Sequence, residues 1–106
     1  MSTRILAFDV SAQRVEKNVG CNFDGLIAGT RGYLVARFGF DAAWKGCKIA
    51  ASFFDASGKE EARPVVNGSC EIPESVLRGD VFYVSLTGMR KGYTIKTNRL
   101  TIRQGR

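Results

Sequence analysis

The sequence contains no histidine and only three cysteines in 106 residues. Without an imidazole there is no ordinary proton shuttle and no Ser-His or Cys-His dyad. The cysteines, Cys21, Cys47 and Cys70, form no Cys-x-x-Cys pair, which argues against a structural zinc site. Cys47 and Cys70 could meet on neighbouring strands, but we expect free, buried thiols in a reducing compartment. The sequence therefore predicts a non-enzymatic protein with no catalytic residues, no metal and no cofactor.

Long apolar runs are also absent, because none approaches the roughly 20 residues that span a membrane. Asp9 interrupts the N-terminal stretch too early for a secretion signal, so we expect a protein that folds in a cytosol without membrane contact. With 44% hydrophobic residues the chain can bury a real core, and residues 1–106 are expected to form a single domain.

Acidic residues are missing from the last quarter of the chain. Residues 1–80 hold equal numbers of acidic and basic side chains, so the whole net charge of +6 lies in residues 81–106. Such a segment favours an acidic partner surface or a nucleic acid, although cations also protect a solvated edge strand from aggregation. The candidate residues for contact with a partner protein are Arg90, Lys91, Lys96, Arg99 and Arg103.

What the sequence does contain is period-two alternation, typical of half-buried strands, in residues 33–40 and 47–54. Between these runs, residues 41–46 suit a tight corner that folds the only tryptophan, Trp44, into the core. We interpret the two runs as the central pair of an antiparallel sandwich. The residues expected in its core are Phe38, Phe40, Trp44, Phe53 and Leu86.

Weaker strand patterns flank this pair at residues 3–10, 14–19, 60–66, 69–72, 81–87 and 93–103. Asn67-Gly68 is a hairpin signal, Pro64 indicates an edge strand, and a bulge near Thr97 would reconcile the two halves of the last strand. One short helical turn is expected near residues 73–78. Seven or eight short strands indicate an all-β sandwich or barrel.

The basic last strand also permits a different function. Single-stranded nucleic acid could stack on Tyr33, Tyr83 or Tyr93 beside the arginines and lysines. No clustered aromatic-basic motif of the RNA-recognition type is present, so this interpretation is the less favoured one. A small cytosolic binding protein, for single-stranded nucleic acid or as an inhibitor of a host protein, is therefore kept as the alternative.

Several segments together resemble a known family. Tyr33–Cys47 combines a Phe-x-Phe strand, a polar corner, a tryptophan and a glycine, and the pattern continues in Lys48–Phe53, Cys70–Leu77, Phe82–Gly88 and Tyr93–Asn98. In order and spacing they resemble the β-sandwich domain at the N-terminus of tail baseplate and head-fibre proteins in phages of Gram-positive bacteria. The likeness covers roughly residues 24–104.

The resemblance implies an immunoglobulin-like antiparallel β-sandwich that attaches to other virion proteins, capsid or tail and baseplate subunits. It implies a virion protein, assembled in the host cytoplasm and present in multiple copies or as a homo-oligomer. Many relatives carry a long fibre or receptor-binding extension, whereas this sequence ends at Arg106. We therefore expect capsid decoration or a small adaptor rather than a host-binding fibre.

Overall fold

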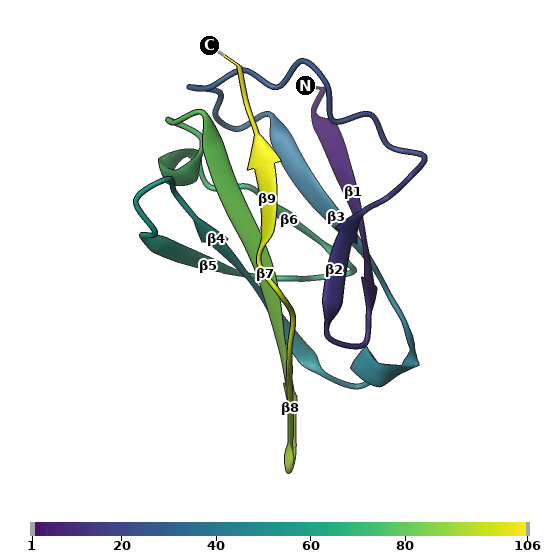
Figure 1. Cartoon of the computed structure of the whole chain (residues 1–106). Coiled ribbons are helices and arrows are strands. Elements are labelled where there is room, and N and C mark those ends of the chain that lie inside the picture. The colour runs from purple at the N-terminus through teal and green to yellow at the C-terminus, as the bar shows by residue number, and fades with distance from the viewer. Residues whose placement is uncertain (1, 106) are drawn as a thin grey trace.

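Two β-sheets pack face to face in the computed structural model, which describes residues 2–105 (Figure 1). The elements in chain order are β1 (Arg4–Ser11), β2 (Arg14–Lys17), β3 (Leu34–Phe40), the 3-10 helix η1 (Ala42–Trp44), β4 (Lys48–Phe54), β5 (Glu60–Pro64), β6 (Ser69–Glu71), the 3-10 helix η2 (Glu74–Val76), β7 (Val81–Arg90), β8 (Tyr93–Lys96) and β9 (Leu100–Arg103).

The strands divide into a first sheet, ordered β2-β1-β3-β6, and a second sheet, ordered β5-β4-β7, in which both β8 and β9 pair with β7. The predicted all-β sandwich is confirmed, and η2 is the helical turn expected near residues 73–78. The described residues form nine strands rather than seven or eight, because the last predicted strand is divided in two. One pairing, β1 with β3, is parallel, whereas the named strands otherwise pair antiparallel.

The two alternating runs in the middle of the chain are not hydrogen-bonded to each other. β3 lies between β1 and β6 in the first sheet, and β4 lies between β5 and β7 in the second. The expected central pair is therefore corrected: each run is an inner strand of its own sheet, and both contribute buried side chains to the same core. Period-two alternation specifies which face is buried, but it does not specify the pairing partner.

The corner at residues 41–46 carries the chain from one sheet to the other. The Asp41 carboxylate accepts hydrogen bonds from the backbone N–H of Ala43 at 3.1 Å and of Ala12 at 2.8 Å. Trp44 follows, with its indole N–H donating to the Ala12 carbonyl at 2.8 Å. These bonds fasten the corner to the β1–β2 turn and place the indole inside the sandwich, where it is 2% exposed.

Aromatic rings form the interior next to this corner. Phe38 stacks on Phe8 with centroids 5.3 Å apart, and Phe40 lies between Phe38 and Trp44. Of the residues expected in the core, four are buried: Phe38, Trp44, Phe53 and Leu86. Phe40 is half-buried and packs against them.

A one-residue bulge divides the last strand. Thr87 pairs with Lys96 and Val84 with Leu100, so three steps along β7 correspond to four along the returning segment. Asn98, in the extra stretch, accepts from the backbone N–H of Val15 in the first sheet at 2.8 Å. Because of the bulge, the apolar side chains of β9 point into the core. The hydrogen bond of Asn98 also links the two sheets along this side.

Candidate protein-binding face

The five cationic residues of the C-terminal segment lie along the ribbon formed by β7, β8 and β9. Arg90 and Lys91 lie at the turn of the β7–β8 hairpin, Lys96 ends β8, and Arg103 ends β9. Arg99 lies in the link between β8 and β9, and all five residues are exposed. Figure 1 shows the β7–β8 hairpin projecting beyond the rest of the sandwich. The structure thus spreads these residues along one ribbon, with Arg90 and Lys91 at the hairpin tip and Arg103 at the opposite end, beside Val81.

Two of the five residues also have structural contacts. The Arg99 guanidinium lies 3.7 Å from the ring centroid of Phe54, covering this buried phenylalanine on the outer face of the second sheet. The Arg90 guanidinium lies 3.9 Å from the Tyr93 ring centroid and donates to the Lys45 carbonyl. Substitutions of Arg99 and Arg90 would therefore change packing as well as charge.

The ion pairs found among residues 2–105 are Arg14–Glu16, Arg31–Glu74 and Arg63–Glu61. None of the five cations of the ribbon takes part in them. Within the described residues, Lys91, Lys96 and Arg103 therefore carry exposed charges without a carboxylate partner.

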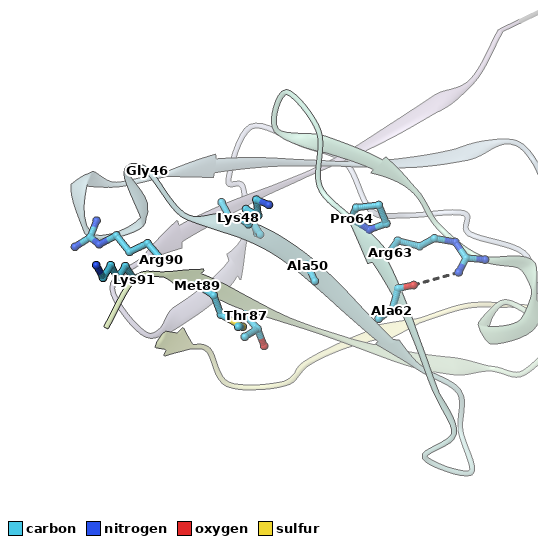
Figure 2. A pocket seen from close by; sticks show the side chains of 11 residues that line it. Gly46, Lys48, Ala50, Ala62, Arg63, Pro64, Thr87, Met89, Arg90 and Lys91 are labelled. Atoms are coloured by element: carbon cyan, nitrogen blue, oxygen red, sulfur yellow. Dashed lines mark hydrogen bonds between the residues drawn. The ribbon is translucent and has the colours of Figure 1, made fainter. Parts of the chain in front are cut away.

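A groove lies beside the hairpin on the outer face of the second sheet, and no pattern in the sequence predicts it. It has a volume of about 760 Å³ and is open to solvent along its length. Figure 2 shows Arg90 and Lys91 at one end, Arg63 and Pro64 at the other, and the Ala50 and Met89 side chains between them. Its lining residues include four basic side chains, Lys48, Arg63, Arg90 and Lys91, and no acidic one.

The strand register explains the hollow. Ala50 on β4 is opposite Pro64 on β5 and Thr87 on β7, so small side chains meet at the centre of the face. Two residues further along the same pair of strands, the longer side chains of Lys48 and Met89 are opposite each other. Small residues surrounded by longer ones leave a shallow groove with an apolar floor. Period-two alternation along the sequence is enough to place Lys48 and Ala50 on the same face of their strand. The groove, however, depends on the register between β5, β4 and β7.

The free edge of β5 borders this groove and is obstructed. Pro64 has no N–H to offer to another strand. The Arg63 side chain donates to the neighbouring Ala62 carbonyl at 3.1 Å and forms an ion pair with Glu61. A hydrogen bond from the Ser75 hydroxyl, followed by the contact with Arg63, lowers the pKa of the Glu61 carboxyl. The edge therefore offers few free backbone groups to a partner.

The three tyrosines considered for base stacking do not share a surface. Tyr33 precedes β3 in the first sheet, whereas Tyr83 lies on the outer face of β7 in the second. Tyr93 donates its hydroxyl to the Ala43 carbonyl at 2.8 Å, and Arg90 covers its ring. These three residues therefore do not form a common stacking platform.

The three cysteines are free thiols and half-buried. Burial raises the pKa of the Cys70 thiol to about 11, and the positive charge of Arg63 opposes this shift. Residues 2–105 contain no group of three or more cysteine, aspartate or glutamate side chains arranged to hold a metal ion. The helices described in this range are too short to cross a membrane.

Comparison of the chain with known protein families, with curated proteins and with solved structures gives no match. The resemblance to phage baseplate and head-fibre domains therefore stays a prediction from the sequence.

Proposed function

We propose that the protein is a non-enzymatic structural subunit of a bacteriophage particle, which decorates the capsid or serves as an adaptor in the baseplate or tail. Its partners are acidic surfaces on other virion subunits, and it is present in multiple copies. The sequence resemblance supports the setting, and the cationic ribbon supports the mode of binding.

The observation that carries the proposal is the set of exposed cations on the ribbon of β7, β8 and β9, whose β7–β8 hairpin projects beyond the sandwich (Figure 1). Lys91, Lys96 and Arg103 have no carboxylate partner among residues 2–105, so their charges are available to a second molecule. Each exposed contact contributes only about 0.2–1 kcal/mol. Repetition over many copies in a symmetric particle multiplies such weak contacts into stable attachment.

Mass spectrometry of purified, DNA-filled particles of the phage that encodes the chain tests this proposal. We expect the protein in the particle fraction, at a copy number that follows the symmetry of the capsid or tail. Its absence from the particles, with the protein present in the infected cell, would contradict the proposal and favour the cytosolic binding protein.

A charge-reversal variant tests the ribbon itself. Lys96→Glu combined with Arg103→Glu should lower particle occupancy at least about tenfold without changing the melting temperature. The matched control, Arg37→Glu with Lys59→Glu, makes the same change in net charge on β3 and in the β4–β5 turn, away from the ribbon. Equal occupancy of the two variants would show that the ribbon is not the contact surface.

A further inference from the structure

We infer that the groove on the outer face of β5, β4 and β7 is a docking site for an acidic protein segment that carries aliphatic side chains. This inference rests on the proposed function, since it specifies where and how a partner chain binds. The docking site differs in location from the cationic ribbon, because most residues that line the groove belong to β4 and β5.

Charge complementarity identifies an acidic partner. Lys48 and Lys91 contribute two exposed cations to the groove that form no ion pair within residues 2–105, and no lining residue is acidic. The Arg90 guanidinium adds positive charge at one end of the groove, although the Lys45 carbonyl and the Tyr93 ring hold it there. A second copy docked through the same face by a two-fold axis would bring these cations together. Electrostatics therefore favours a partner of opposite charge over self-association.

The apolar floor of the groove favours a partner with aliphatic side chains. Ala50, Ala62, Pro64 and Met89 form its apolar part, and Met89 is 56% exposed. Methionine is common at surfaces that adapt to partners, because its side chain is flexible and polarisable. No aromatic residue lines the groove, so it lacks the stacking platform that single-stranded nucleic acid uses. An open groove also encloses too little of a small ligand to bury most of its surface.

The backbone of β5 identifies the mode of docking. The Val65 N–H donates to the Ile49 carbonyl at 2.9 Å, so the backbone groups of Val65 point toward β4. Because backbone groups alternate in direction along a strand, those of Ala62 and Pro64 point the other way, toward the free edge. Pro64 lacks a donor there, and the Ala62 carbonyl accepts from Arg63. Strand addition at this edge is therefore obstructed, and the partner lies across the face of the sheet, held by side chains.

Nuclear magnetic resonance of the isotopically labelled protein tests the inference with two synthetic octapeptides of equal charge. One alternates glutamate with leucine, and the other alternates glutamate with glycine. The leucine peptide should shift the amide resonances of Lys48, Ala50 and Met89, and should bind at least about tenfold more tightly than the glycine peptide. Equal affinities, shifts confined to other residues, or no shift at about 1 mM peptide would overturn the inference.

Matched variants distinguish binding in the groove from nonspecific electrostatic attraction between the peptide and the whole protein. Lys48→Glu should weaken binding of the leucine peptide at least about tenfold, whereas Arg37→Glu, a matched charge reversal on β3 in the first sheet, should weaken it less than about twofold. Met89→Ser should weaken the leucine peptide and leave the glycine peptide unchanged. Equal losses in the two charge-reversal variants would overturn the inference. So would tighter binding of a single-stranded oligodeoxythymidylate at this groove, or concentration-dependent shifts of the groove residues without peptide, which indicate a second copy.

The two proposals can fail separately. Peptide binding in the groove without the protein in particles would contradict the virion function and leave the docking site standing. A protein present in particles whose occupancy and peptide binding are both unaffected by Lys48→Glu would support the virion function and overturn the docking site.

Discussion

Gly88 is the position where one added methyl group should cost the most. It lies on the inner face of β7, and a Cβ atom there would come within 2.7 Å of Cε3 and 2.8 Å of Cζ3 of Trp44. The Cβ of Cys47 lies 3.2 Å away on another side. The indole cannot easily retreat, because its N–H is bonded to the Ala12 carbonyl and its ring packs against Phe40. The Gly88→Ala variant must therefore strain the core or displace Trp44.

Overpacking of this kind costs about 1–3 kcal/mol. Alanine also gains about 0.5–1 kcal/mol over glycine within a strand, so the net loss should lie in the lower part of that range. Each kcal/mol corresponds to about 4–8 °C in melting temperature for a domain of this size. Because Trp44 is the only tryptophan, its fluorescence follows both unfolding and any displacement of the indole in the folded state.

Gly39→Ala is the matched control, since this strand glycine has Asp9 Oδ1 as its nearest neighbour at 3.7 Å, an ordinary contact. We expect the control to keep or slightly raise stability. In a double-mutant cycle, Trp44→Phe should reduce the cost of Gly88→Ala, because the smaller ring leaves room for the methyl group. If Gly88→Ala and Gly39→Ala unfold within about 0.5 kcal/mol of each other, the steric reasoning is wrong.

Three further predictions concern single side chains. Trp44→Ala should lower the free energy of unfolding by about 3–5 kcal/mol in urea titrations, and an unchanged midpoint would contradict the burial of the ring. Hydrogen bonds from the Ser57 hydroxyl and the Lys59 backbone lower the pKa of Asp55 below its usual 3.8. Its stabilisation is thus complete above that pH and is lost as pH falls through the folded pKa, so Asp55→Asn should show a smaller acid-induced loss of stability than the parent protein. With a pKa of about 11, the Cys70 thiol is only about one part in a thousand thiolate at about pH 8. Mass spectrometry should find its alkylation at least about a hundredfold slower in the folded than in the urea-unfolded protein, and similar rates would refute its burial.

The strands could be predicted from the sequence because alternation is a local property. Residues 33–40 and 47–54 each contain a strand, β3 and β4, and the bulge was visible as a change of parity near Thr97. Pairing is a different matter, since it depends on where the 41–46 corner leads. That corner crosses between sheets because Asp41 and Trp44 both bond to Ala12, a contact between residues about thirty positions apart. No local pattern encodes such a contact.

The same distinction applies to the candidate site. The charge of residues 81–106 is a property of composition, so a cationic partner-binding segment could be proposed before any fold was known. The groove next to it requires that Ala50, Pro64 and Thr87 lie side by side on three strands, and this depends on the register. The cations that line the groove come from two parts of the chain, with Lys48 in the middle and Arg90 and Lys91 in the C-terminal segment. The cationic segment alone can attract any acidic surface, whereas a groove with an apolar floor selects among acidic partners by their side chains. If the protein has a specific partner, we therefore expect the selectivity to depend on β4 and β5, and the rate of association to depend on the C-terminal ribbon.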